Sequence, residues 1–257
     1  MPSQDVVIEV LDARLPRASS NPVITELRGA KPAIKVLTKS DLADPAVTSA
    51  WLAHFATEPN VTAFASTTDK PGLTRKRLAE LSRGLADHRG KDKPVRALIA
   101  GVPNVGKSTL INTLASRAVA KVGNKPAVTK EQQLVKLDSG MQLTDTPGLM
   151  WPKIDDERRA FRLAFAGSIP DTAIDYYTIA LFGAAYLVSN YPELVVARYK
   201  LDAGPRSADD LLVEIGRRRG LLLKGGAVDL HKAAELFVHE FRAGTIGAIS
   251  LETPAPT

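Results

Sequence analysis

A glycine-rich stretch followed by lysine and serine holds the residues best suited to chemistry. It runs Gly101-Val102-Pro103-Asn104-Val105-Gly106-Lys107-Ser108, after an apolar run and before apolar residues at helical spacing. Between a strand and a helix, such a stretch wraps phosphates with backbone N–H groups and with the positive end of the helix. Lys107 would then reach the β- and γ-phosphates, and Ser108 would ligate Mg²⁺. We therefore predict a phosphate-binding loop.

A second motif, Asp145-Thr146-Pro147-Gly148, lies 38 residues beyond Lys107 and follows another expected strand. Asp145 can hold a Mg²⁺-bound water, and the N–H of Gly148 can contact the γ-phosphate. Thr129 lies between the two motifs and is the candidate switch threonine that completes the Mg²⁺ shell. The expected catalytic residues are therefore Lys107, Thr129 and Gly148, and the expected metal residues are Ser108, Thr129 and, through a water, Asp145.

A third motif, Thr38-Lys39-Ser40-Asp41, stands at the end of an expected strand and could recognise a base. The carboxylate of Asp41 could accept from both N1–H and the exocyclic amine of guanine, which adenine cannot offer together. The stem of Lys39 could lie across the base and ribose, and Ser66 and Thr67 could support the base from a loop. Each feature alone is also compatible with an ordinary turn or loop. Asp41 argues against the weaker alternative of an ATP-binding loop.

The motifs are positioned by expected strands that alternate with helices. Apolar runs predict strands over residues 6–11, 33–37, 61–65, 95–100, 133–137 and 141–144, with a hairpin-like turn at 138–140. Asn21-Pro22 and Asp44-Pro45 are typical beginnings of helices between them. Strands and helices in βαβ order predict an α/β fold with a parallel-rich sheet covered on both faces.

Composition limits the class of protein. The chain has 257 residues, of which 44% are apolar and 24% charged, as in a globular protein. It has no cysteine, which excludes disulfides, thiolate zinc sites and cysteine nucleophiles. The net charge of +6 fits a polyanionic partner. The longest uncharged run, residues 176–192, is interrupted by polar residues and proline, so we expect no membrane span. We expect a cytoplasmic protein, and we expect it to be a monomer.

The order of the motifs points to a family. The base motif and its supporting loop precede the phosphate loop, whereas in an ordinary GTPase they come last. The chain therefore looks like a circularly permuted GTPase, and it resembles the YlqF/RbgA-type ribosome-biogenesis GTPases over nearly its whole length. The matching stretches are Leu11-Asp12-Ala13-Arg14-Leu15-Pro16, Ser20-Asn21-Pro22, Gly101 to Thr109, Asp145-Thr146-Pro147-Gly148-Leu149-Met150-Trp151-Pro152-Lys153 and His239-Glu240-Phe241-Arg242-Ala243-Gly244.

The resemblance implies GTP hydrolysis to GDP and phosphate as a switch in large ribosomal subunit assembly, stimulated by the ribosome. It also implies a GTPase core and a C-terminal helical RNA-binding domain. We place the circularly permuted GTPase domain at 1–160, with a linker at 87–94 that its polar and basic residues indicate, the helical domain at 161–250, and a disordered Pro/Thr tail at 251–257. The large subunit and its rRNA are the expected partners, and GTP/GDP, Mg²⁺ and K⁺ the expected ligands. The expected GTP-binding residues are Thr38, Lys39, Ser40, Asp41, Ser66, Thr67, Asn104, Val105, Gly106, Lys107, Ser108, Thr109 and Gly148.

Two departures from the family pattern bear on activity. Thr38 stands where the family usually has an asparagine that contacts guanine. The family also usually begins with a helix carrying a Gly-His element implicated in hydrolysis, whereas this sequence begins at the following strand. Leu149 is hydrophobic, as is normal for the family, and no side chain is evident that orients the attacking water. The alternative is an RNA-binding assembly factor whose GTP/GDP pocket is a non-hydrolysing sensor.

Three features of the sequence are each compatible with two interpretations. Asn104 resembles the phosphate-loop asparagine that accompanies potassium dependence, and it could equally stabilise the loop. The run 217–219 of three arginines could complement a helix dipole or contact phosphates of RNA. The basic run 75–77 is expected to be a solvated helix face, with rRNA contact as the alternative.

Overall fold

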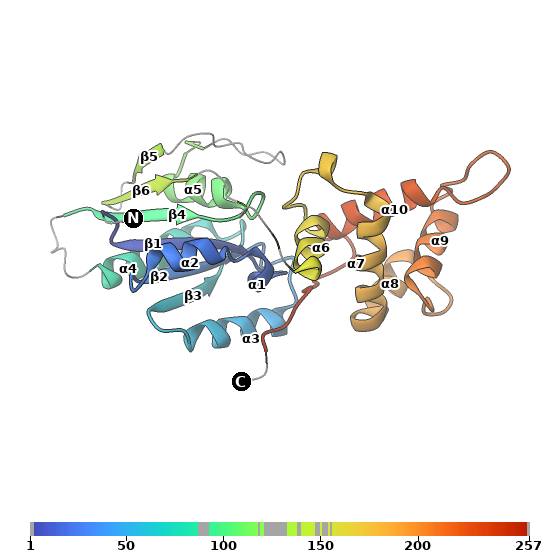
Figure 1. The fold of residues 1–257 in the computed structure, drawn as a ribbon, viewed down its shortest axis with the longest axis horizontal. Coiled ribbons are helices and arrows are strands. Elements are labelled where there is room, and N and C mark those ends of the chain that lie inside the picture. Colours follow the sequence, from blue (N-terminus) through green and yellow to red (C-terminus); the bar gives the residue numbers. More distant parts are fainter. Residues whose placement is uncertain are drawn as a thin grey trace. The chain divides into compact units, whose positions relative to one another are not determined.

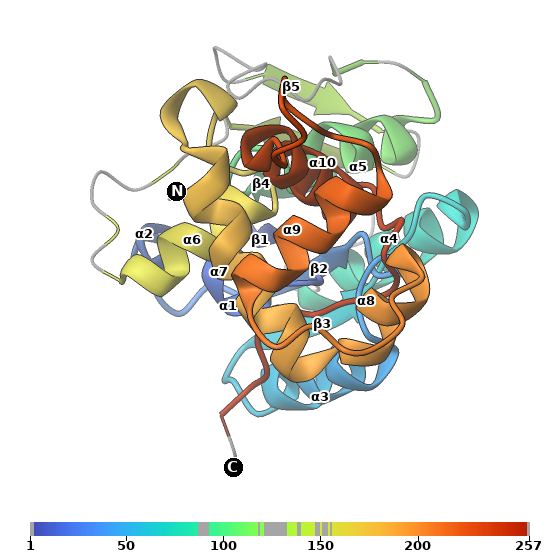
Figure 2. The same ribbon diagram turned by 90° about the vertical axis from the view of Figure 1, so that its right-hand side faces the viewer.

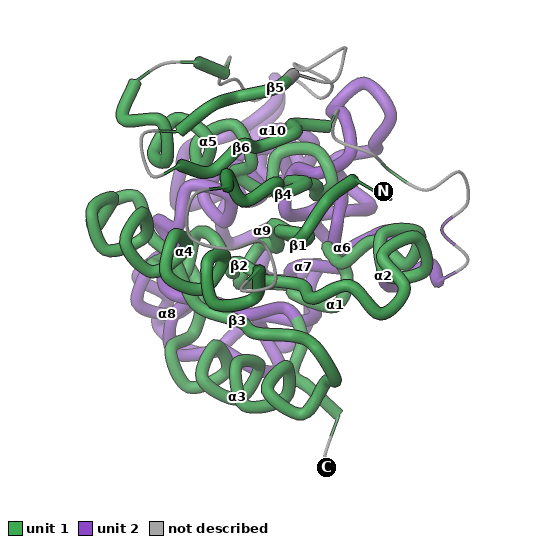
Figure 3. Tube along the Cα trace, turned by 90° about the vertical axis from the view of Figure 1, so that its left-hand side faces the viewer, with its two compact units in different colours: residues 1–153, 252–257 green, residues 154–251 purple. Residues whose placement is uncertain are grey.

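The computed structural model describes residues 3–86, 93–117, 119–120, 133–137, 140–146, 150, 154 and 156–255. The chain divides into two compact units, which Figure 3 distinguishes by colour. The first comprises Met1–Lys153 with Glu252–Thr257, and the second comprises Ile154–Leu251. The division falls at 153–154 and not at 160, because helix α6 (Glu157–Phe165) packs on a helix of the second unit.

The first unit is built on a six-stranded sheet in the order β3-β2-β1-β4-β6-β5 (Figure 1). All neighbouring strands are parallel except β5 and β6, which form an antiparallel pair. The expected α/β class with a parallel-rich sheet is therefore confirmed. The strands are β1 (Val6–Asp12), β2 (Ala33–Thr38), β3 (Val61–Ala65), β4 (Val95–Ala100), β5 (Gln133–Lys136) and β6 (Met141–Asp145).

The interior position of β1 explains its sequence. All seven of its residues are buried, as expected for a strand inside a parallel sheet with both faces covered. The chain runs from β1 to β2 and β3 on one side, and then returns to place β4 on the other side of β1. The order of the strands thus reverses between β1 and β4, where open α/β sheets bind ligands at their carboxyl edge.

The helices of the first unit begin at the expected caps. The side chain of Asn21 accepts from Val23 N at 3.0 Å, and that of Asp44 accepts from Ala46 N at 2.8 Å. The helix that Asn21 caps is followed at its C-terminus by Gly29, whose φ of 57° suits glycine. The helices are α1 (Pro16–Ser19), α2 (Pro22–Arg28), α3 (Pro45–Ala56), α4 (Pro71–Leu85) and α5 (Lys107–Ala115).

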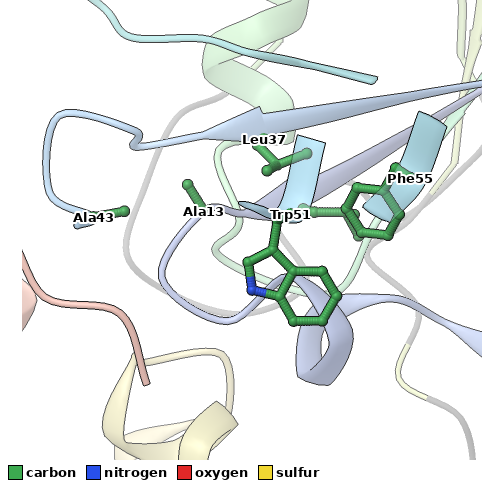
Figure 4. Packing of buried hydrophobic residues seen from close by; sticks show 6 residues of the cluster. Ala13, Leu37, Ala43, Trp51 and Phe55 are labelled. Carbon is green, nitrogen blue, oxygen red and sulfur yellow. The ribbon is translucent and has the colours of Figure 1, made fainter. Parts of the chain in front are cut away.

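Helix α3 packs beside the carboxyl ends of β1 and β2. Figure 4 shows Trp51 and Phe55 of this helix near Leu37, and the two rings are stacked with centroids 5.4 Å apart. Leu11 and Ala13 complete this buried cluster from the end of β1. The packing holds the two strand ends in place, and the base motif directly follows one of them.

The second unit is helical, as expected. Its helices α7, α9 and α10 pack against one another (Figure 2). Ser207 accepts from Asp210 N at 3.1 Å, and Asp229 accepts from Lys232 N at 3.1 Å, so these two side chains cap the N-termini of α9 and α10. The helices are α6, α7 (Tyr176–Asn190), α8 (Pro192–Tyr199), α9 (Ala208–Arg218) and α10 (Leu230–Arg242), with a 3₁₀ turn at Asp171–Ala173.

Aromatic rings form the centre of the second unit. The rings of Phe165 and Phe241 stack with centroids 4.1 Å apart. A Cβ at Gly183 would lie 2.3 Å from the ring of Phe165, so glycine allows α7 to approach α6 this closely. Of the helices described, none is by itself long and apolar enough to cross a membrane. The α7–α8 pair, bent by 111°, meets that test by length and composition only.

The expectation of a disordered tail from residue 251 is wrong for its first residues. Leu251 and Glu252 are buried. A carboxylate oxygen of Glu252 accepts from Ala18 N at 2.9 Å, and its carbonyl accepts from Trp51 Nε1 at 3.1 Å. Ala18 lies in the first turn of α1, where N–H groups have no partner inside the helix. Tertiary hydrogen bonds therefore order a segment whose composition alone suggests disorder.

Three other expected features fall partly or wholly outside the described residues. Residues 87–92 of the linker and residues 138–139 of the expected turn are among them. The strands that flank this turn do pair, with Val135 opposite Leu143. The segment that contains Thr129 also lies outside the described residues.

Candidate functional site

The sequence motifs meet at one edge of the sheet. Thr38 ends β2, Ser66 follows β3, Gly101 follows β4 and Asp145 ends β6. These four strands and β1 are parallel, so their carboxyl ends lie at the same edge. The strand order alone accounts for bringing together residues that are far apart in the sequence.

The loop between β4 and α5 has the backbone of a phosphate cradle. Asn104 and Gly106 adopt left-handed φ values of 60° and 94°. A Cβ at Gly101 would lie 2.7 Å from the carbonyl oxygen of Val10, so the loop requires glycine where it leaves the sheet. Helix α5 begins at Lys107, and its N-terminus adds N–H groups and positive partial charge. This backbone can bind an anion.

Two buried charges face each other beside the loop. The Nζ of Lys107 donates to Oδ1 of Asp145, and both side chains are almost fully buried. Buried charges need such a partner because desolvation is costly. A bound phosphate would offer Lys107 a second anion, and Asp145 could then hold a metal-bound water. Thr146 donates to the carbonyl of Ile99 at 3.0 Å, which holds the start of this motif on β4.

The hydroxyl of Thr38 joins three parts of the site. Its single proton is shared between the carbonyl oxygens of Leu11, at 2.9 Å, and of Val105. Leu11 belongs to β1, and Val105 lies in the phosphate loop. Thr38 is 8% exposed, so water competes little for these hydrogen-bonding groups. The threonine that replaces the usual asparagine thus ties the end of β2 to the phosphate loop.

Lys39 makes a second connection to the same loop. Its Nζ donates to the carbonyl oxygen of Asn104 at 2.7 Å and to Oδ2 of Asp12 at 2.8 Å. Its backbone has a left-handed φ of 54°. The stem of Lys39 is therefore held at both ends, between β2 and the phosphate loop.

The remaining base-motif residues lie next to these. Ser40 N donates to the carbonyl of Ser66 at 3.4 Å, which brings the two loops together. The hydroxyls of Ser66 and Thr74 are hydrogen-bonded at 2.9 Å, and Thr67 accepts from Asp69 N at 3.3 Å. Asp41 is exposed. The structure thus places the two parts of the expected base site side by side.

The structure describes only some of the residues that are expected to complete the site. Ser108 and Thr109 are half-buried in the first turn of α5. Thr129 and Gly148 lie outside the described residues, and so does Leu149.

A buried ion cluster at the end of β1 was missed by the sequence analysis as a functional element. Asp12 is fully buried, and Arg14 donates to both of its oxygens at 3.0 and 2.8 Å. Burial raises the pKa of Asp12, but Arg14 and Lys39 together outweigh burial and hold that pKa below its ordinary value of 3.8. Charged residues directly after a buried strand, at the edge where the other motifs lie, are the signal that could have found this cluster.

The donors present fit a magnesium ion that is held mainly by phosphate and water. Among the described residues, no group of three or more His, Cys, Asp or Glu could hold a metal by itself. Mg²⁺ commonly keeps several waters and takes only one or two protein ligands beside substrate phosphates. Ser108 and Asp145 flank the phosphate loop and suit that role.

The arginine run of the second unit is engaged in ion pairs there. Arg217 contacts Glu214 at 3.0 Å, Arg218 contacts Asp202 at 2.6 Å and Arg219 contacts Glu240 at 3.1 Å. Arg217 and Arg218 lie in the last turn of α9, where they also complement the helix dipole. In the other basic run, Arg75 donates to the hydroxyl of Ser116.

Comparisons with known proteins find similarity to ribosome-associated GTPases. A model of the family "50S ribosome-binding GTPase" matches residues 96–179. "Ribosome biogenesis GTPase A" of Priestia megaterium is 41% identical over 98% of this chain and 90% of that protein. The protein of the same name from Thermotoga maritima is 34% identical over 97% of this chain and 86% of its own length.

Two solved structures resemble the whole fold. A GDP-bound structure of TM YlqF has a TM-score of 0.70 and 30% identity, and it covers 97% of this chain and 95% of its own. A GNP-bound structure of YlqF from T. maritima has a TM-score of 0.68 and 30% identity, with 98% of this chain and 94% of its own covered.

Proposed function

The chain belongs to the ribosome biogenesis GTPase A (YlqF/RbgA) family of circularly permuted GTPases, and from that premise we propose that it is a switch in large ribosomal subunit assembly. As a member of this family it binds GTP and GDP and is a GTP-hydrolysing enzyme. In the proposed cycle, hydrolysis to GDP and phosphate is stimulated by the ribosome and ends one stage of assembly.

One observation carries the proposed nucleotide site. Thr38 and Lys39 donate to the carbonyls of Val105 and Asn104, so the base motif is hydrogen-bonded to the phosphate loop. A single ligand with a base at one end and phosphates at the other fits this arrangement. We assign Asp41 to guanine recognition, with Ser40, Ser66 and Thr67 behind the base. Gly106 and Thr109 complete the phosphate side.

The proposed catalytic residues act on the phosphates. Lys107 leaves Asp145 and neutralises charge on the β- and γ-phosphates. Ser108, through its hydroxyl, and Thr129 would hold Mg²⁺, and Asp145 would hold a water of that ion. Mg²⁺ would neutralise charge that develops on the phosphates during transfer. The N–H of Gly148 would contact the γ-phosphate, and Asn104 would hold K⁺.

The proposed partner is the large ribosomal subunit with its rRNA. The description of the matching family model names 50S ribosome binding, and the chain carries a net charge of +6. That charge lies in residues 1–185, since residues 186–257 hold nine basic and nine acidic residues. RNA contact by the helical second unit is therefore proposed through a local patch, with Arg217 as a candidate because its side chain is 64% exposed despite its ion pair. We place this function in the cytoplasm and assign it to the monomer.

The test of the switch is single-turnover GTP hydrolysis with and without large subunits. We expect an unassisted rate on the order of 10⁻⁴ to 10⁻³ per second and a stimulation of roughly 10³- to 10⁵-fold, the range seen when a group is supplied in trans. Subunit affinity should fall steeply with salt because counterions are released from RNA. Small subunits are the matched control. Absence of both binding and stimulation would contradict the ribosomal function and leave a guanine-nucleotide-binding enzyme.

The test of base recognition is calorimetry with GDP, ADP and xanthosine diphosphate. A site that hydrogen-bonds guanine should reject adenine by roughly 10⁴- to 10⁵-fold in a favourable case. Asp41→Asn should move the preference toward the xanthosine nucleotide, because it reverses one donor–acceptor pair. Equal affinity for ADP and GDP would refute the role assigned to Asp41.

A further inference from the structure

At the end of β1, one carboxylate forms ion pairs with two cations. Asp12 accepts from Arg14 through both oxygens, which already forms a complete two-pronged ion pair. Oδ2 of Asp12 also accepts from Lys39 at 2.8 Å. The side chains of Asp12 and Arg14 are 0% and 1% exposed, whereas that of Lys39 is 26% exposed. The buried pair therefore points one carboxylate oxygen toward a lysine at the nucleotide site.

The desolvation cost of burying Asp12 and Arg14 indicates that the ion pair has a role besides stability. Taking ions out of water costs more than an ion pair commonly returns, and apolar replacements of such pairs are often as stable. An ionised carboxylate that Arg14 orients is, however, a rigid acceptor. Its position relative to β2 is set by the register that places Asp12 opposite Thr38.

Lys39 is held between this acceptor and the phosphate loop. Its Nζ donates to Asp12 and to the carbonyl of Asn104, 65 residues away in the sequence. A lysine side chain has several rotatable bonds and loses rotamer entropy when it is fixed. Fixing it before the nucleotide arrives removes that loss from binding.

We propose that Asp12 is a positioning residue for guanine-nucleotide binding: its carboxylate, oriented by Arg14, holds the ammonium of Lys39 against the phosphate loop and so places the lysine stem where the base and ribose lie. This inference rests on the role of Lys39 in the proposed nucleotide site. It assigns to Asp12 no contact with the nucleotide. Its effect is transmitted through Lys39 alone.

The test is a double-mutant cycle on GDP affinity, measured by calorimetry on the full chain. The variants are Asp12→Asn, Lys39→Met and their combination. Asp12→Asn should weaken GDP binding on the order of tenfold, and in the Lys39→Met background it should cost less than about twofold, since residues that act through one contact are not additive. A purely structural role of Asp12 would give the same loss in both backgrounds.

Controls separate this effect from damage to the fold. Glu58→Gln removes the 2.9 Å ion pair with Lys35 of β2, the strand that Lys39 follows, and it should leave GDP affinity unchanged. If Asp12→Asn fails to fold because Arg14 loses the carboxylate of Asp12, the cycle is repeated with Asp12→Asn/Arg14→Gln, which removes both charges. Thermal unfolding of each variant confirms that it is folded before binding is measured.

Each result decides between the inferences. Additive losses, or no loss from Asp12→Asn, would overturn the role of Asp12 and leave the proposed function intact. Unchanged GDP affinity in Lys39→Met alone would instead refute the role of Lys39, and with it both the base-site assignment and this inference.

Discussion

Replacing Thr38 with valine tests whether its hydroxyl couples the base motif to the phosphate loop. The substitution keeps the shape of the side chain and removes the proton that is donated to Leu11 O, at 2.9 Å, and to Val105 O. The site is 8% exposed, so water replaces the lost hydroxyl poorly. Leaving a buried polar group without its partner costs about 1–3 kcal/mol.

Part of that cost should appear as lost affinity. Val105 lies in the proposed phosphate-binding loop, and its hydrogen bond to Thr38 ties that loop to β2 whether or not a nucleotide is bound. A loss of about 1.4 kcal/mol in binding corresponds to about tenfold in Kd. We therefore expect Thr38→Val to weaken GDP binding on the order of tenfold, measured by isothermal calorimetry.

Thr48→Val is the matched control for this prediction. Thr48 is 6% exposed and donates to the carbonyl of Asp44 at 2.8 Å inside helix α3, away from the phosphate loop. Both variants should unfold at lower urea concentration than the wild type, but Thr48→Val should bind GDP normally. Equal GDP affinity in Thr38→Val and the wild type would refute the coupling. Equal losses in both variants would show a general effect on stability.

Three further outcomes are expected. Lys107→Ala should abolish GTP turnover in a single-turnover assay. In urea unfolding it should lower the free energy of unfolding by about 3–5 kcal/mol, because the buried carboxylate of Asp145 loses the cation of Lys107. Exchanging K⁺ for Na⁺ should slow hydrolysis and leave GDP affinity unchanged if Asn104 holds a monovalent ion, whereas equal rates would assign Asn104 to loop stability. Glu252→Ala should lower stability by about 1 kcal/mol, as other lost helix caps do, because the N–H of Ala18 loses its acceptor. An unchanged melting temperature would show that the carboxylate of Glu252 contributes nothing to stability.

The sequence by itself determined the features that depend on neighbouring residues. Asn21 and Asp44 begin helices because their side chains accept from N–H groups two residues later. The stretch that begins at Gly101 is recognisable because close backbone approach and left-handed angles favour glycine. Such constraints act over a few residues, so their signal lies in a short stretch of sequence.

Only the tertiary structure decided which of these features touch. The bond of Thr38 to Val105 and that of Lys39 to Asp12 join residues 67 and 27 positions apart, and both require β1 to lie beside β2 and β4. The docking of Glu252 on Ala18 spans 234 positions and overrides a composition that suggests disorder. A run of apolar residues predicts a strand but not its neighbours, because many strand orders would bury the same side chains. Very few of those orders would also make the contacts seen at the carboxyl edge of the sheet.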